Sequence, residues 1–210
     1  MSFDYYSMLT QFGNFYPLNL KIKSPNQLVD WTEENFEYVP YNPRKKIDRW
    51  GLSITSLNGG VDGIPDLDSL SEYNKENDTA YKEEDFCVHT PVYEHPELKK
   101  ILSPFDNYYV RTHFLKLNPG GFFPPHRDLK NDKFKYFRLI VPLNNYNPPY
   151  FNFILEDKML YWEGGKVYFF DSAKVHYLFN CSSKPSYWIV INVNTNEHTV
   201  KTVMKHFEAI

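Results

Sequence analysis

The chain has 210 residues, which is enough for one domain that buries a hydrophobic core without disulfides or structural metals. Hydrophobic residues make up 42% of the sequence and aromatic residues 18%, which favours a β-rich fold because aromatic side chains fit a pleated, half-buried surface. A net charge of −3 gives no electrostatic case for nucleic acid or an anionic membrane as a partner.

The two cysteines, Cys87 and Cys181, do not have the paired spacing of metal ligands, so the sequence excludes a zinc ribbon and predicts free thiols in a reducing compartment. The N-terminal residues lack the basic and apolar regions of a signal peptide, and no apolar run approaches the length of a membrane span. We therefore expect a cytoplasmic protein without a membrane partner. Nothing in the sequence predicts an oligomeric state.

Residues 1–104 are expected to form an N-terminal segment that wraps around a sheet and supplies aromatic side chains to its outside. Within it, Trp50–Leu57 alternates apolar and small polar residues, which predicts a strand. Residues 66–85 are polar and acidic with little apolar periodicity, which predicts a long loop or a mobile lid. Short helices are expected near Ser2–Phe12, Pro25–Phe36 and Pro96–Pro104.

Residues 105–195 read as the core of a single domain that spans residues 1–210. Eight short strands separated by turns argue for a sandwich or barrel, with the jelly roll among the candidates. The tail 196–210 has apolar residues at helical spacing and predicts a C-terminal helix outside the core. The predicted strands are Tyr108–Leu117, Phe122–Asp128, Lys135–Leu143, Tyr150–Leu155, Met159–Trp162, Lys166–Asp171, His176–Phe179 and Tyr187–Val193.

Metal-ligand chemistry centres on the stretch Pro124–Asp128. His126 and Asp128 are two residues apart in an extended segment, so their side chains point the same way and can bind one ion from one side. The pair alone is a weak signal in a chain with seven histidines and 26 acidic residues, and the alternative is a surface turn. His176 follows a later strand and would complete a two-histidine, one-carboxylate facial triad of the kind that binds ferrous iron.

An ordered series of motifs runs through the second half of the chain. It lies in Val110–Gly121, Pro124–Asp128, Phe137–Asn145, Trp162–Val167 and Asp171–Asn180. An arginine, a Pro-Gly, a His-x-Asp, an Arg-x-x-x-Pro-Leu, a Glu-Gly-Gly and a late histidine in this order are much more specific than any one of them. The series resembles the aspartyl/asparaginyl β-hydroxylase family. The resemblance covers residues 97–194 and implies a double-stranded β-helix core, that is, a cupin-like jelly roll.

The resemblance also implies an activity, that of an Fe(II)- and 2-oxoglutarate-dependent dioxygenase. It makes His126, Asp128 and His176 the iron ligands. Enzymes of this family use O2 to couple the oxidative decarboxylation of 2-oxoglutarate, the cosubstrate, to hydroxylation of a C–H bond. The implied substrate is a peptide or a free amino acid with an Asp-, Asn- or Pro-type side chain.

The sequence departs from the family at the cation that binds the distal carboxylate of 2-oxoglutarate. The family has an arginine ten residues after the late histidine, where this chain has Ser186. Arg138 is the favoured replacement, because a charged residue among apolar neighbours in a strand needs a partner, and Ser186 would add a hydroxyl. Lys184 is nearer in sequence but lies in a predicted turn.

Arg111 and His113 precede the metal motif on one face of a predicted strand. Arg111 either binds a carboxylate of the cosubstrate or substrate, or pairs with an acidic residue of the protein. For His113 the favoured alternative is a hydrogen-bonded core histidine, and the other is a residue of the substrate pocket.

Two alternatives to a hydroxylase follow from the same residues. In one, the chain is a cupin-like metal or small-molecule binding protein that lost catalysis together with the cosubstrate arginine. In the other, the jelly roll is a structural component in which His126, Asp128 and His176 do not meet.

Overall fold

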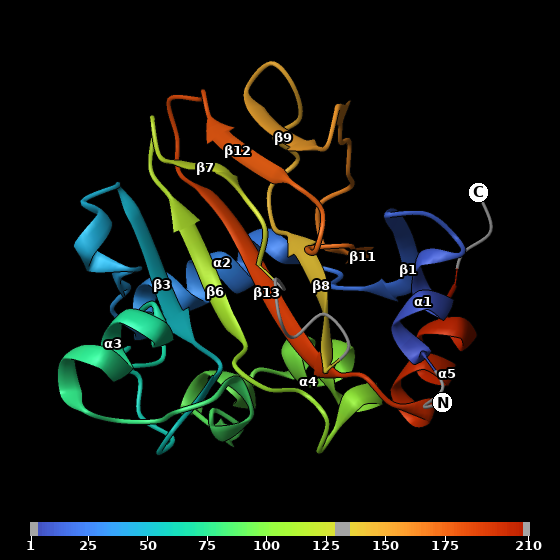
Figure 1. The fold of residues 1–210 in the computed structure, drawn as a ribbon. Coiled ribbons are helices and arrows are strands. Elements are labelled where there is room, and N and C mark those ends of the chain that lie inside the picture. Colours follow the sequence, from blue (N-terminus) through green and yellow to red (C-terminus); the bar gives the residue numbers. More distant parts are fainter. Residues whose placement is uncertain (1–3, 129–134, 208–210) are drawn as a thin grey trace.

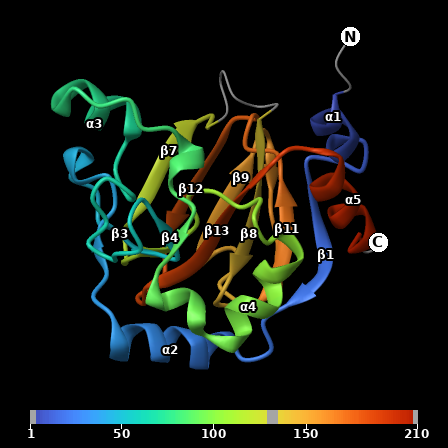
Figure 2. The same cartoon turned by 90° about the horizontal axis from the view of Figure 1, so that it is seen from below.

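Two β-sheets that pack face to face form the centre of the molecule, and helices cover the outer face of the larger sheet (Figures 1 and 2). The computed structural model describes residues 4–128 and 135–207. Its strands are β1 Phe15–Lys21, β2 Val39–Pro40, β3 Arg49–Ser53, β4 Thr55–Ser56, β5 Val88–His89, β6 His113–Leu117, β7 Phe122–His126, β8 Tyr136–Pro142, β9 Phe151–Leu155, β10 Lys158–Met159, β11 Lys166–Phe170, β12 His176–Asn180 and β13 Ser186–Asn194.

The helices lie mainly before β6 and after β13. They are α1 Tyr5–Thr10, α2 Pro25–Asn35, α3 Leu70–Asn77, α4 Pro96–Leu102 and α5 Glu197–Lys205, with short 3-10 turns at Pro43–Lys45, Glu83–Asp85, Pro91–Glu94 and Ser103–Phe105. The predicted helices at both ends of the chain are therefore confirmed. Among the described residues, no helix is long and apolar enough to cross a membrane.

From β6 onward the chain passes repeatedly between the two sheets. The seven-stranded sheet has the order β1-β11-β8-β13-β6-β3-β2, and the four-stranded sheet has the order β10-β9-β12-β7. One wall of a barrel-like interior thus consists of β6, β8, β11 and β13, and the other of β7, β9, β10 and β12. Within each wall, neighbouring strands pair antiparallel. This alternation is the jelly roll that the turn-separated strands predicted.

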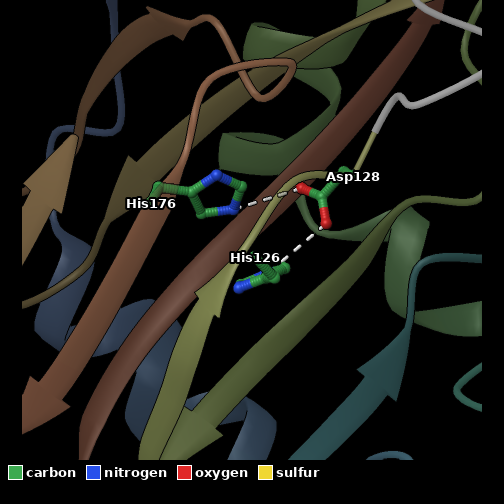
Figure 3. Close-up of side chains that lie close together, drawn as sticks. All are labelled: His126, Asp128 and His176. Atoms are coloured by element: carbon green, nitrogen blue, oxygen red, sulfur yellow. Dashed lines mark ion pairs between the residues drawn. The ribbon is translucent and has the colours of Figure 1, made fainter. Parts of the chain in front are cut away.

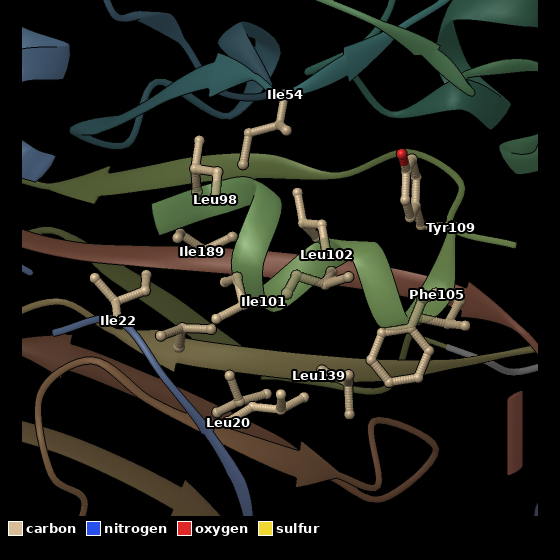
Figure 4. Close-up of a cluster of buried hydrophobic side chains, with 14 of the residues drawn as sticks. Leu20, Ile22, Ile54, Leu98, Ile101, Leu102, Phe105, Tyr109, Leu139 and Ile189 are labelled. Carbon is tan, nitrogen blue, oxygen red and sulfur yellow. The ribbon is translucent and has the colours of Figure 1, made fainter. Parts of the chain in front are cut away.

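The larger sheet is buried on both faces and separates two hydrophobic cores. Inside the barrel, Trp188 of β13 packs against Phe153 of β9. On the outer face, Ile189 of β13 packs in one cluster with Leu98 and Leu102 of α4 (Figure 4). Each fully buried side chain of this size contributes about 1.5–3 kcal/mol, which explains why the β13 sequence is almost continuously apolar.

The N-terminal segment does more than wrap the fold, because two of its strands extend the larger sheet. Strand β1 pairs with β11, and β3 pairs with β6. The β1 strand was not predicted, since Pro17 lies within it. A proline is tolerated there because β1 is an edge strand and needs only one set of ladder hydrogen bonds. As predicted, aromatic side chains of this segment reach the outer core, where Tyr16 stacks on Phe169.

The prediction of a loop or lid at residues 66–85 is wrong for its middle part, which forms the helix α3. No residue of α3 is buried, so the helix lacks the apolar periodicity by which a sequence reveals an amphipathic helix. Ion pairs to the preceding segment hold it in place instead, from Arg44 to Glu76 and from Lys45 to Glu72.

Candidate metal centre

His126, Asp128 and His176 converge at one end of the barrel (Figure 3). His126 ends β7 and His176 begins β12, and the two residues are direct partners in the antiparallel ladder. Their Nε2 atoms each lie 3.4 Å from a carboxylate oxygen of Asp128. One ligand atom from each residue lies within 4.8 Å of the others, so the three predicted ligands do meet. The alternative in which they stay apart is wrong.

Backbone carbonyls orient both imidazoles for metal binding. Nδ1 of His126 lies 2.7 Å from the carbonyl oxygen of Pro124, and Nδ1 of His176 lies 2.9 Å from that of Lys174. A hydrogen bond donated by Nδ1 places the lone pair on Nε2, which faces the common centre. Each histidine is thus held in the tautomer that a metal ligand needs, by the peptide two residues before it.

Arg138 reaches the triad from the larger sheet, and Asn192 of the same sheet binds Arg138. Nη1 of Arg138 donates to Oδ2 of Asp128, and Nε donates to Oδ1 of Asn192 at 2.9 Å. Burial by itself raises the pKa of Asp128, but the positive charge of Arg138 outweighs it and holds this pKa well below its ordinary value. The carboxylate is therefore ionised and oriented before a metal binds.

Two cavities meet at the triad and share Tyr41, Phe123, His126 and Asp128. The first, of about 70 Å³, extends into the barrel between apolar side chains. The second, of about 260 Å³, lies between β7 and the segment that leads into β3. Its further lining residues are Asn42, Lys45, Ile47, Arg49 and Pro124. A metal at the triad would therefore face space on which polar groups converge, as expected of a ligand site.

His113 is a pocket residue, the second of the two predicted alternatives. It is buried on β6, lines the inner cavity, and lies beside Tyr41 with ring centroids 5.3 Å apart. Its Nδ1 has no hydrogen-bond partner among the described residues, contrary to what a hydrogen-bonded core histidine would show. Burial, reinforced by the charges of Arg111 and Arg138, holds the pKa of His113 well below its ordinary value, so the ring is neutral.

Arg111 takes the structural alternative, because its Nη2 lies 2.7 Å from Oε1 of Glu83. Ser186 is buried at the start of β13, and its hydroxyl accepts a hydrogen bond of 2.9 Å from Nε1 of Trp188. Lys184 is exposed in the turn before β13 and lines neither of the two cavities at the triad. Its position therefore does not support the prediction that it binds the cosubstrate.

Two residues at the site, Tyr41 and Arg49, were not predicted from the sequence. Both come from the N-terminal segment, outside the residues that resemble the family. The sequence did contain one indication of Arg49, which is a charged residue at the start of a strand whose other residues are apolar or small. The same pattern identified Arg138.

Comparison with known proteins agrees with the geometry of the site. The sequence model described as Aspartyl/Asparaginyl beta-hydroxylase matches residues 71–195. The chain belongs to this family. No curated protein sequence matches the chain significantly.

Solved structures share the fold of this hydroxylase-family chain at low sequence identity. An oxidoreductase of the 2OG-Fe(II) oxygenase family from Burkholderia pseudomallei is 11% identical, with 92% of this chain and 89% of that chain covered and a TM-score of 0.53. HygX from Streptomyces hygroscopicus, solved with nickel, 2-oxoglutarate and hygromycin B, is 8% identical, with coverage of 93% and 88% and a TM-score of 0.54.

The predicted family, jelly-roll fold and metal triad are thus confirmed, and the chain is a 2-oxoglutarate-dependent Fe(II) hydroxylase by family. The donor set fits the cofactors that are typical of the family. Two imidazole nitrogens and one carboxylate on one side of an ion are the ligands of non-haem Fe(II) oxygenases, and they leave positions open for 2-oxoglutarate and O2. His126, Asp128 and His176 would hold the iron.

Proposed function

We propose that this chain is an active Fe(II)- and 2-oxoglutarate-dependent dioxygenase that hydroxylates the side chain of an amino acid. The substrate is a peptide or a free amino acid of the Asp, Asn or Pro type. The observation that carries the proposal is the triad, whose three donors are already oriented and which adjoins cavities large enough for ligands. The family to which the chain belongs supports the amino-acid class of substrate.

The residues around the triad have separable roles in this proposal. The bound iron supplies O2 activation that is coupled to decarboxylation of 2-oxoglutarate. Arg138 keeps Asp128 ionised and fixes its direction. The apolar side chains of Phe153 and Leu178 line the inner cavity and limit the access of water to the reacting centre.

The polar wall of the larger cavity is where a substrate would be recognised. Tyr41, Asn42 and Lys45 line this wall beside His126. They offer a hydroxyl, an amide and a cation, which match the backbone and carboxylate groups of a peptide or amino acid. HygX, of the same fold, binds hygromycin B, so the fold does not by itself determine the substrate.

The test measures conversion of 2-oxoglutarate to succinate by the Fe(II)-loaded protein, with and without pools of peptides and free amino acids. A true substrate should accelerate succinate formation and gain one oxygen atom, as seen by mass spectrometry. The His176→Ala variant, which lacks one ligand, is the matched negative control.

The opposite result would support the alternative of a binding protein without catalysis, for which Ser186 at the family's arginine position is the motivating feature. In that case the protein would bind the metal but would neither bind nor convert 2-oxoglutarate, whatever substrate is offered.

A further inference from the structure

Arg49 is a buried cation for which the described residues offer no anionic partner. Its side chain belongs to a residue only 4% exposed, and its Nε and Nη2 atoms are buried without a hydrogen-bond partner among the described residues. The other buried or half-buried arginines all have carboxylates: Arg44 pairs with Asp68 and Glu76, Arg111 with Glu83, and Arg138 with Asp128. An unpaired buried charge costs several kcal/mol, so it calls for a ligand.

The sheet register places Arg49 in line with the position where the family has its cosubstrate arginine. Arg49 of β3 is the ladder partner of Leu117 of β6, and Leu117 is the ladder partner of Ser186 of β13. Residues directly opposite in a ladder project from the same face, and Leu117 belongs to the core inside the barrel. The side chain of Arg49 therefore leaves β3 on the inner face of the sheet. It lies in the same row as Ser186, the position at which the family has its arginine.

The side chain of Arg49 extends from that row toward the metal centre. Its guanidinium carbon lies 4.2 Å from the centroid of the Phe123 ring, and this ring stacks on His126 with centroids 5.7 Å apart. Arg49 lines the larger cavity together with His126 and Asp128. One aromatic ring thus separates the free cation from a metal ligand, and one cavity reaches both.

The charges in this cavity favour an anion with two carboxylate ends. Asp128 is already neutralised by Arg138, and Lys45 at the rim of the cavity pairs with Glu72. Arg49, by contrast, has only the faces of Phe123 and Tyr41 beside it among the described residues. Burial lowers the pKa of Arg49, but an arginine stays protonated in proteins. A ligand that binds the metal at one end and carries a second carboxylate at the other would satisfy both centres.

We propose that Arg49 binds the distal carboxylate of 2-oxoglutarate and so replaces, from the neighbouring part of the sheet, the arginine that position 186 lacks. This inference rests on the proposed function. It differs from the sequence-based choice of Arg138, because both sides of that guanidinium are engaged by Asp128 and Asn192. In the part of the chain that the structure describes, Nε and Nη2 of Arg49 have no partner, and this planar fork suits a bidentate carboxylate.

The test is isothermal titration of 2-oxoglutarate into the full-length, Mn(II)-loaded protein and its variants. Arg49→Met should weaken binding about 100-fold, and Arg49→Lys about tenfold, since a charged hydrogen bond is lost or loses its fork. Arg44→Met removes an arginine that pairs with Asp68 and Glu76 outside the cavities, and should bind 2-oxoglutarate as the wild type does.

A second ligand, 2-oxopentanoate, tests whether Arg49 acts on the distal carboxylate alone or on the rest of the cosubstrate. 2-Oxopentanoate has the same five-carbon chain with a methyl group in place of that carboxylate. It should bind the wild type and Arg49→Met with the same, weak affinity. Mn(II) affinity should not change in Arg49→Met, and its melting temperature without ligands should be equal or higher, because a methionine removes an unpaired buried charge.

Three results would overturn the inference. If the wild type binds 2-oxoglutarate and Arg49→Met binds it equally well, the anchor lies elsewhere and the proposed function stands. If Arg138→Met loses the distal-carboxylate preference and Arg49→Met keeps it, the anchor is Arg138. If the metal-loaded wild type does not bind 2-oxoglutarate at all, both the inference and the proposed function fail.

Discussion

At the scale of single residues, short-range hydrogen bonds prepare the site. The peptide oxygens of Pro124 and Lys174 fix the tautomers of the two histidines, each from two residues away. The proline pair Pro124-Pro125 favours an extended backbone at Phe123 and Pro124, in the strand β7 that ends at His126. Such local preorganisation lowers the ordering cost that metal binding would otherwise carry.

Removing one ligand should abolish tight metal binding. We expect His176→Ala to bind Mn(II) or Fe(II) at least about 100-fold more weakly, because even the loss of groups that only orient ligands costs about 10–100-fold. Competition with a fluorescent chelator measures the affinity. His198→Ala is the matched control, since His198 is exposed and stacks on Tyr108 away from the triad. Equal affinities of the two variants would contradict the assignment.

Asp66 should make stability depend on pH. It is 2% exposed, and burial raises its pKa from 3.8 to about 6, even though it accepts a hydrogen bond from the peptide of Leu57. The folded protein therefore binds this proton more tightly than the unfolded chain, so the contribution of Asp66 is most favourable below about pH 4. It falls by up to about 3 kcal/mol as the pH rises through 6.

The variant Asp66→Asn should lose that pH dependence. Its free energy of unfolding, measured in urea, should match the wild type near pH 4 and exceed it near pH 7, because the amide stays neutral. A difference between the two proteins that is the same at both pH values would show that Asp66 does not titrate in this range.

At the scale of elements, the burial of both faces of the larger sheet determines which residue types its strands can contain. β13 needs apolar side chains on alternate sides because it separates the barrel core from the helix-covered core. Edge strand β1 accepts Pro17, and surface helix α3 is held by ion pairs and by hydrogen bonds of Asn74 rather than by a buried face. The Glu163–Gly165 turn joins β11 to the chain before it, with Gly165 at φ +82°.

Two glycines with nearly the same positive φ should differ sharply in the stability that a substitution by alanine costs. Gly165 has φ +82°, and an added Cβ would collide with the carbonyl oxygen of Ile22, whereas Gly120 has φ +81° and nothing within 4 Å of such an atom. Gly120→Ala should cost about 1–2 kcal/mol from the left-handed backbone, and Gly165→Ala about 1–3 kcal/mol more. Equal losses in urea unfolding would contradict the close contact to Ile22.

At the scale of the whole molecule, the site lies where the two sheets meet. His126 and His176 belong to the four-stranded sheet, while Arg138 reaches the triad from the seven-stranded sheet, held there by Asn192. Arg49 comes from a strand that only the N-terminal segment supplies. No single element contains the site, so only the folded chain can bind metal and cosubstrate together.

Metal binding should therefore raise the melting temperature. At a metal concentration of 100 times the dissociation constant, the folded state gains about 2.7 kcal/mol, which is about 5–10 °C for a domain of this size. Differential scanning fluorimetry with Mn(II), before and after adding a chelator, measures the shift. His176→Ala should show no shift, and an equal shift in that variant would mean that the ion binds elsewhere.

The motif series and strand pattern alone determined the family, the jelly roll and the three metal ligands. These depend on short spacings and on alternation within strands, which the local chain sets through its backbone geometry. Helix α3 was not predictable in this way, because a helix without a buried face has no apolar period.

Only the tertiary structure decided what the arginines do. Arg111 and Arg138 look alike in sequence, yet one pairs with Glu83 and the other orients Asp128. Arg49 carries no motif, and its link to Ser186 exists only through the register of β3, β6 and β13. Whether a buried charge has a partner depends on which strands lie side by side, and residues far apart in the chain settle that.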